Sequence, residues 1–196
     1  MTHARGIGRR RLFALMVSAV AATAVVASVM VYVLAIRASD ALAGPTTETI
    51  TGLTMDVDDV ATWGMLLVWN TGDSPIVLED LPLNPDQDTS QVQDPIEVQR
   101  LQVVPTESLK GETTIGMSAG AGEKVIPEAK RSPLAGYELA PGVRVSVLVQ
   151  YRALKEGAWK YDTVTMAYKE GRRSGSLTLT QGLSVCAPSD KPCPFD

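Results

Sequence analysis

The chain has 196 residues, enough for one domain with its own core even after a membrane segment is subtracted. Its formal net charge is −4, but residues 1–44 hold five Arg and one Asp, which leaves 13 basic and 21 acidic residues, a balance of −8, for residues 45–196. A body this acidic repels phosphate groups, so the charge argues against nucleic-acid binding.

The N-terminal part of the chain has the pattern of a membrane anchor. Residues 1–12 form a basic tail, and residues 13–36 are a run of 24 residues without a charge. A helix rises about 1.5 Å per residue, so this run is long enough to cross a hydrocarbon core of about 30 Å. Because excess positive charge stays on the cytoplasmic side, we expect the N-terminus in the cytoplasm and the C-terminal domain outside the cell membrane.

A cleavable signal peptide is the alternative to this anchor. The small residues Ala41 to Ala43 have the composition of a cleavage site, and cleavage near Ala43 would give a secreted protein. The apolar core of a cleavable signal is usually about 7–15 residues, shorter than the run here, which favours an uncleaved signal anchor. Residues 37–48 are small, polar and interrupted by proline, and we expect a linker there.

From residue 49 onward the sequence is typical of an all-β domain. We expect about seven to nine short strands and no helix beyond residue 36. Residues 62–70 form a dense apolar run that ends in a turn, and residues 75–83 are expected to be its partner strand. Residues 142–154, 159–171 and 176–186 are expected to form an antiparallel meander. In the first of these segments Val143, Val145, Val147, Val149 and Tyr151 alternate with mostly polar residues, which predicts one buried face.

Two stretches carry a resemblance to a known class of domain. They are "LLVWNTGDSPIVLEDLPL" (residues 66–83) and "LAPGVRVSVLVQYR" (residues 139–152). In the first, a strand ends in Asn-x-Gly-x-x-Pro before an aliphatic strand, and in the second a Leu-x-Pro-Gly turn opens a strand. Both resemble the Ig-like β-sandwich ectodomains of bacterial membrane-anchored and surface proteins. The resemblance implies an antiparallel β-sandwich over residues 49–196 with an adhesive, scaffolding or accessory role, and it transfers no catalytic residue.

An acidic segment between two expected strands has the oxygen spacing of a calcium loop. Counted from Asp86, donors fall at positions 1, 3, 5, 9 and 12 of an EF-hand loop, at Asp86, Asp88, Ser90, Asp94 and Glu97. The segment lacks the glycine that an EF-hand requires at position 6, and its flanks read as strands, so an EF-hand is not expected. A calcium site of another kind, using Asp86, Asp88 and Asp94, remains an alternative to a plain acidic loop.

Two residue counts limit the chemistry of the outer domain. The only histidine is His3 in the basic tail, which removes His-dependent triads, Cys-His dyads and His-containing zinc sites from the expected ectodomain. The only cysteines are Cys186 and Cys193, and in an oxidising space an isolated pair of this kind predicts a disulfide that pins the C-terminal tail.

We therefore expect a non-catalytic envelope module without a cofactor, bound to a protein or cell-envelope partner. The alternatives are a calcium-dependent adhesive module and an enzyme that cleaves envelope glycans with a pair of carboxylates. For the enzyme, Tyr151, Trp159 and Tyr161 are candidates for an aromatic surface that stacks against sugars, although such residues more often belong to a core.

Overall fold

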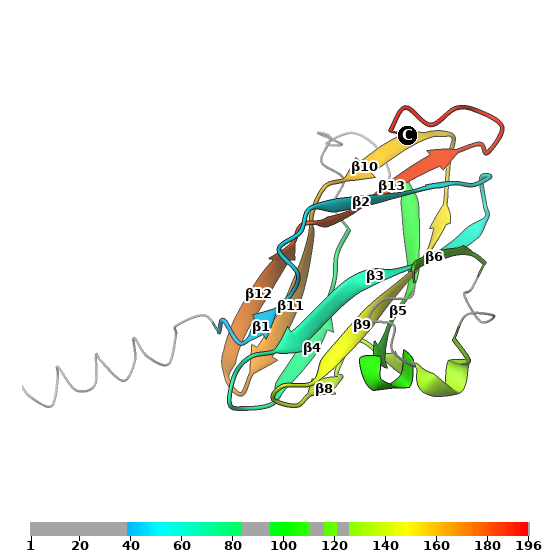
Figure 1. Ribbon diagram of the computed structural model, residues 1–196. Coiled ribbons are helices and arrows are strands. Elements are labelled where there is room, and N and C mark those ends of the chain that lie inside the picture. Colours follow the sequence, from blue (N-terminus) through cyan, green and yellow to red (C-terminus); the bar gives the residue numbers. More distant parts are fainter. Residues whose placement is uncertain (1–38, 84–94, 110–115, 121–125, 196) are drawn as a thin grey trace, which may run out of the picture. The chain divides into compact units, whose positions relative to one another are not determined.

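The structure is a computed structural model that describes residues 39–83, 95–109, 116–120 and 126–195. Residues 38–196 form one compact unit of the chain. The described residues form strands and two short 3-10 helices, Thr106–Leu109 (η1) and Glu128–Lys130 (η2), and none of them is in an α-helix. The all-β prediction for this part of the chain is confirmed (Figure 1).

Six strands form the largest sheet, in which every pair is antiparallel. Its order is β1 (Leu42–Ala43), β3 (Val60–Asn70), β9 (Arg144–Ala153), β5 (Ile96–Pro105) and β7 (Ser132–Pro133), with β6 (Gly116–Ala119) also paired to β3. The long central strands are β3 and β9, the two segments in which the sequence shows its densest apolar patterns.

Two smaller sheets complete the domain. The four-stranded sheet has the order β12 (Arg173–Leu179), β11 (Val164–Glu170), β4 (Ile76–Asp80) and β8 (Glu138–Leu139). The three-stranded sheet has the order β10 (Gly157–Tyr161), β13 (Gln181–Ala187) and β2 (Thr49–Thr54). The pair β13–β2 is parallel, so the expectation of a purely antiparallel arrangement is wrong at this one pair of strands.

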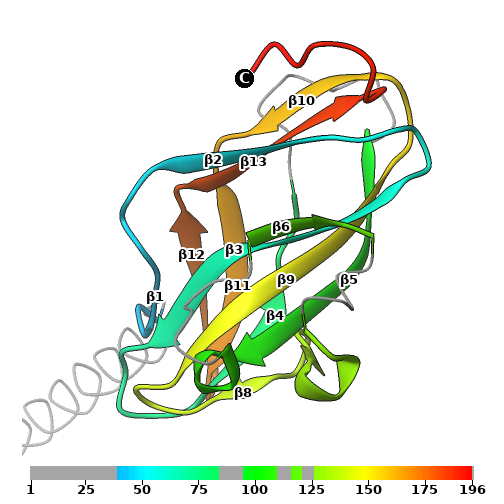
Figure 2. The same cartoon turned by 45° about the vertical axis from the view of Figure 1, so that its right-hand side comes forward.

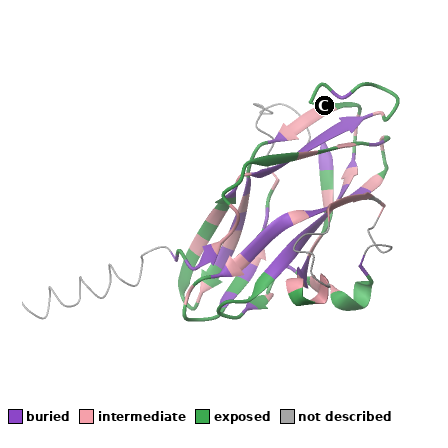
Figure 3. Ribbon diagram, viewed as in Figure 1, coloured by how far each residue is buried: buried purple, intermediate pink, exposed green. Residues whose placement is uncertain are grey.

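All three sheets contribute side chains to one hydrophobic core. The predicted buried face of β9 is confirmed for Val145, Val147, Val149 and Tyr151, which are fully buried, but not for Val143, which precedes the strand and is exposed. Ser146 and Leu148 on the opposite face are buried as well, so that face is less exposed than expected. Across the core from the predicted face of β9 lie Ile76 and Leu78 of β4, Met166 and Tyr168 of β11, and Leu183 and Val185 of β13. Figures 1 and 2 show the six-stranded sheet facing the four-stranded sheet, and Figure 3 shows buried residues along the central strands β3 and β9.

The last two segments of the predicted meander pair with each other in antiparallel fashion, as β10 with β13 and β11 with β12, but each of them changes sheets along its length. Residues 157–170 form β10 and then β11, and residues 173–187 form β12 and then β13, so each segment starts in one small sheet and ends in the other. A Cβ atom at Gly182 would meet the carbonyl oxygen of Tyr161, so glycine allows the close approach at this bend. Strand β9 pairs with β3 and β5 and not with its sequence neighbour β10.

The expected pairing of residues 75–83 with β3 is also wrong. Strand β4 lies in the four-stranded sheet, beside β11 and β8, and the turn after β3 passes between sheets. The buried side chain of Asn70 holds this turn. Its amide donates to the carbonyl oxygens of Ser74 and Leu139, each at 2.8 Å, and its oxygen accepts the N–H of Gly72 at 2.9 Å. A turn fixed in this way redirects the chain across the core and does not form a hairpin.

The segment expected as a linker belongs to the fold. Residues 39–48, here called the strap, run from β12 past β3 to the start of β2. Ala41 and Leu42 are buried in the core, and the strap forms β1 against the end of β3. Apolar side chains at these two positions give the segment enough burial to be ordered, which its polar, proline-containing composition concealed.

No helix within the described ranges is both long enough and apolar enough to cross a membrane. The predicted anchor at residues 13–36 and the basic tail at residues 1–12 lie outside these ranges, so both stay predictions.

Candidate interaction site at the edge of strand β2

Within the described part of the chain, strand β2 is hydrogen-bonded on one side only. The N–H of Thr49 donates to the carbonyl oxygen of Thr180 at 3.2 Å, and the N–H of Met55 donates to that of Cys186 at 2.9 Å. Backbone groups of a strand alternate between its two sides, and the register of the β2–β13 pair is continuous between these bonds. Every second residue from Thr49 to Met55 therefore directs its backbone groups towards β13.

The residues between them face the open side of β2: Ile50, Gly52 and Thr54. Each offers one N–H and one C=O, and none of the described residues forms a hydrogen bond with these groups. At about 3.3 Å per residue they make a row roughly 13 Å long. All three residues are exposed, and Ile50, at 43%, is among the most exposed large hydrophobic residues of the described chain. Figure 3 shows β2 as a largely exposed strand.

The other sheet edges in the described ranges are less suited to receive a strand. Strands β1, β7 and β8 have two residues each and β6 has four, whereas β10 carries Lys160 and β5 carries Glu97 and Arg100. The edge of β12 carries Arg173 and meets the strap at one residue, where the N–H of Ser39 donates to the carbonyl oxygen of Ser174 at 3.2 Å. Short, charged and covered edges resist strand addition, so β2 is the described edge best suited to it.

Acidic residues lie at both ends of β2, while the strand itself has no charge. Glu48 precedes it, and Asp56, Asp58 and Asp59 follow it, all of them exposed. The carboxylate of Asp56 accepts hydrogen bonds from the backbone N–H of Ser189 at 2.9 Å and from its hydroxyl at 2.7 Å. These bonds favour the ionised form and lower the pKa of Asp56 below its ordinary value.

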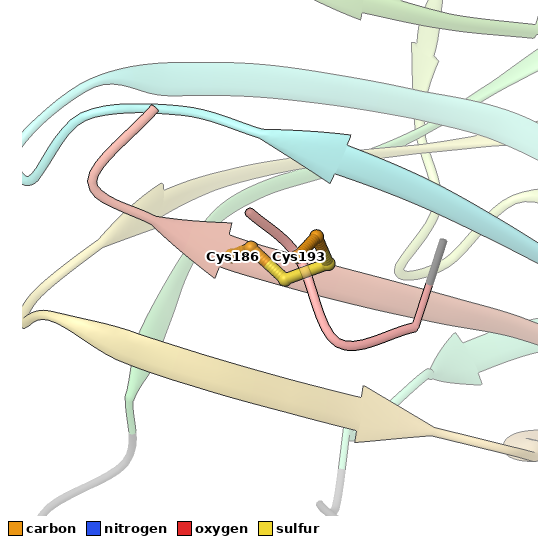
Figure 4. Close-up of a disulfide and its surroundings, with 2 residues drawn as sticks. All are labelled: Cys186 and Cys193. Atoms are coloured by element: carbon orange, nitrogen blue, oxygen red, sulfur yellow. A yellow bond between two sulfur atoms is a disulfide. The ribbon is translucent and has the colours of Figure 1, made fainter. Parts of the chain in front are cut away.

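The predicted disulfide between Cys186 and Cys193 is confirmed, with a Cα–Cα distance of 5.6 Å. Figure 4 shows that it joins the end of β13 to the C-terminal tail. Both cysteines are buried, which shields the bond from reagents in solution. Beside it the side chain of Lys191 binds Glu156 at 2.8 Å, and this bond raises the pKa of Lys191. The disulfide and the Ser189–Asp56 bonds tie the tail to the end of the three-stranded sheet, next to the end of β2.

Two shallow cavities do not have the lining of a sugar-binding cleft. One, of about 340 Å³, lies between the tail and the ends of β10 and β13, and the other, of about 400 Å³, lies where the chain after β4 passes β5 and β7. Their walls consist of proline, aliphatic, polar and charged side chains together with the disulfide-bonded Cys186, and neither wall includes an aromatic residue.

The three candidate aromatic residues do not form an exposed surface. Tyr151 and Tyr161 are fully buried in the core, and Trp159 is half-buried against it. Burial is the main reason that the pKa of Tyr151 is raised, with a smaller contribution from Tyr161. The alternation of β9 and β10 puts all three side chains on the inner faces of their sheets, so they stabilise the domain and are not placed to stack against a sugar.

The candidate calcium ligands Asp86, Asp88 and Asp94 lie outside the described residues, and the calcium site stays a prediction. Among the residues that are described, no three Asp, Glu, His or Cys side chains gather closely enough to hold a metal ion. Thermal unfolding of the chain with millimolar calcium or with a chelator tests the prediction, because a ligand that binds only the folded state raises its stability.

The edge of β2 was not singled out in the sequence, although part of its pattern is visible there. Thr49–Thr54 is an uncharged run of β-prone residues between acidic neighbours. Whether such a strand lies inside a sheet or at its edge depends on its partners. Its one partner, β13, lies more than 120 residues away in the chain, and that pairing is not readable from local sequence.

Comparison with known proteins does not place the chain in a family. No protein-family model matches it, and no curated protein does. One similar solved structure is the Vibrio cholerae VesB protease, with a TM-score of 0.37 and 12% identity, covering 76% of this chain and 32% of that one. Another is the ASH or PapD-like domain 7 of human CEP192, with a TM-score of 0.39 and 7% identity, covering 78% of this chain and 89% of that domain.

The chain thus spans about a third of the length of the protease structure. Similarity at this level carries over neither a catalytic residue nor a ligand. The candidate site therefore rests on the geometry of β2 alone.

Proposed function

We propose that this chain is a single-pass membrane protein whose Ig-like, extracytoplasmic β-domain is a non-catalytic binding module. A protein or envelope partner adds an extended segment to the edge of β2 and continues the three-stranded sheet. Main-chain hydrogen bonds provide the affinity in this mode of recognition, and neighbouring side chains provide the specificity.

The observation that carries the proposal is the unpaired row of backbone groups at Ile50, Gly52 and Thr54. Soluble domains usually protect an edge with a charge, a proline or a covering segment, because an open edge invites pairing with other chains. Strand β2 has none of these among the described residues, whereas the strap meets the edge of β12. Strand β2 is the longest described edge strand that has neither a charge within it nor a covering segment, and we therefore place the partner there.

The position of the strap supports an uncleaved anchor over a secreted form. Cleavage after Ala43 would remove Ala41 and Leu42 from the core and would remove β1 from its sheet. It would also remove Ser39, whose carbonyl oxygen accepts the hydroxyl of buried Tyr168 at 2.7 Å. An intact strap is therefore part of the stable fold. Alkaline extraction of membranes tests the anchor: the full-length chain is expected in the pellet, and a shortened soluble chain would support secretion instead.

Photo-crosslinking in cells tests the binding edge. A photoreactive amino acid replaces Ile50 in the full-length chain, and the matched control carries it at Thr178 on β12, which is also exposed. We expect a specific adduct from position 50 and none of the same mass from position 178. Thr54→Pro in the position-50 chain should abolish the adduct, because proline removes an outward N–H that holds no bond within the described structure.

Thr178→Pro is the control for the proline substitution, since it puts the same residue on the edge of β12. It should leave the position-50 adduct intact. Equal adducts from positions 50 and 178, or an adduct that survives Thr54→Pro, would contradict the proposed binding edge.

A further inference from the structure

The charges around β2 indicate which kind of segment it binds. We infer that the strand added to β2 has an uncharged middle and a Lys or Arg at each end. This inference rests on the proposed function, because it names the partner of the same edge. It follows from three features of the described residues. These are the position of the acidic residues near β2, the absence of an ion pair to those acidic residues, and the side chains along β2.

The acidic neighbours lie beyond the two ends of the open row. Glu48 comes two residues before Ile50, and Asp58 and Asp59 follow Thr54 within the next five residues. A strand paired with Ile50, Gly52 and Thr54 is about as long as the row, so one of its ends lies beside Glu48. Its other end lies at the turn that carries Asp58 and Asp59, whose backbones are bonded to Ala153. Both ends of β2 are acidic, so a basic residue at each end of the partner fits whether it runs parallel or antiparallel.

Among the described residues, none of the ion pairs involves Glu48, Asp56, Asp58 or Asp59. Asp56 is bonded to Ser189, and Asp59 accepts the backbone N–H of Asp56, so both contacts are with neutral groups. Lys191, on the same tail as Ser189, is bound to Glu156. The carboxylates at this end of β2 are therefore open to a cation that arrives with the partner.

The middle of β2 favours uncharged side chains in the partner. Leu53 is half-buried and packs against the core, so a partner residue beside it on the inner face covers apolar surface. On the outer face, Gly52 has no side chain between Ile50 and Thr54, which leaves room for a large residue there. A charge placed beside Leu53 or Ile50 would lose water without gaining an opposite charge.

A display library of random peptides, selected on the full-length chain in mild detergent, tests the inference. Selection on the Thr54→Pro variant identifies and removes peptides that do not use the edge. The peptides that remain should be enriched in Lys and Arg towards both ends, with an uncharged middle of β-prone residues. The triple variant Glu48→Gln, Asp58→Asn and Asp59→Asn keeps the backbone of β2 and removes three negative charges.

Exposed ion pairs contribute little individually, so the triple variant should bind the selected peptides roughly tenfold more weakly at low salt. The difference should shrink as salt screens the charges. Peptides that depend on Thr54 but show no basic ends, or that bind the triple variant equally well, would overturn this inference and leave the binding edge in place. A selection that yields no peptide dependent on Thr54 would contradict the proposed function itself.

Discussion

Strands β2 and β12 are the outer strands of two different sheets, and they differ in whether another segment bonds to their outer edge. The edge of β12 meets the strap, which donates to the carbonyl oxygen of Ser174 from Ser39 and reaches Thr180 through the carbonyl oxygen of Thr47. The edge of β2 has no such neighbour among the described residues. Both strands are rich in Ser, Thr and Gly, so their own composition does not explain the difference.

The comparison shows that the edge of β12 is covered by residues outside the strand, those of the strap. Buried Ala41 and Leu42 anchor the strap in the core, and this position brings Ser39 to β12. The same chain then continues directly into β2. One short segment therefore covers one edge and leads to the strand that leaves the other edge open.

The largest expected effect comes from releasing the strap. Leu42→Ala removes a buried side chain from the core and should lower the free energy of unfolding by about 2–4 kcal/mol. Denaturant unfolding measures this loss. Since β2 is held by β13, the amides of β2 that face β13 should exchange hydrogen as slowly as before. Faster exchange at Thr49 and Leu53, whose amides face β13, would contradict the separation of the two edges.

Removal of the disulfide should have the next largest effect. The bond closes a short loop, so Cys186→Ala with Cys193→Ala should cost about 2–3 kcal/mol. Thermal unfolding of the oxidised chain against this double variant measures the difference. The tail is joined to β13 by the disulfide and to Asp56 by Ser189, but no bond among the described residues joins it to Ile50, Gly52 or Thr54. Thr54-dependent peptides should therefore still bind the double variant. Loss of their binding would place the tail in the site.

A smaller loss is expected when one bond of the strap is removed. Tyr168→Phe deletes the hydroxyl that donates to the buried carbonyl oxygen of Ser39 at 2.7 Å. An unsatisfied buried carbonyl should cost about 1–2 kcal/mol of unfolding free energy, measured with denaturant. Thr165→Val on the same strand, which removes an exposed Thr–Thr contact at 3.3 Å, is the control and should cost less.

The smallest effect concerns pH at the acidic end of β2. The pKa of Asp56 is lowered by its bonds with Ser189, so its contribution to stability is present above its unfolded pKa of about 3.9 and is lost as pH falls through the folded pKa. Asp56→Asn should therefore be less stable than the natural chain at neutral pH, and the two should converge at acidic pH. Thermal unfolding across pH measures this; a gap that widens on acidification would contradict the assignment.

Local pattern predicted the strands but not their partners. The alternation in residues 143–151 predicted the buried face of β9, and the isolated cysteine pair predicted the disulfide. The meander was right for its last two segments, which pair with each other, and wrong for β9, which pairs with β3 and β5. The bends beyond Tyr161 and at Thr180, which move the chain between sheets, were also missed, because a bend of one or two residues leaves the alternating pattern almost intact. The strap was not predicted from the sequence, because only two buried residues, Ala41 and Leu42, are needed to order it.

The candidate site was the hardest part to predict. The register between β2 and β13 decides that the backbone groups of Ile50, Gly52 and Thr54 face outward. These two strands come from opposite ends of the domain's sequence. Sequence shows that residues 49–54 are uncharged, but it does not show which side of the strand is free. The candidate calcium ligands were a local pattern, and they remain a separate prediction.

Residue-resolved amide hydrogen exchange of the full-length chain, with and without a selected peptide, tests the central claim most directly. The account predicts that the amides of Ile50, Gly52 and Thr54 become protected on binding, while those of Thr49 and Leu53, already bonded to β13, change little. Protection elsewhere in the domain, with these three amides unchanged, would contradict strand addition at β2.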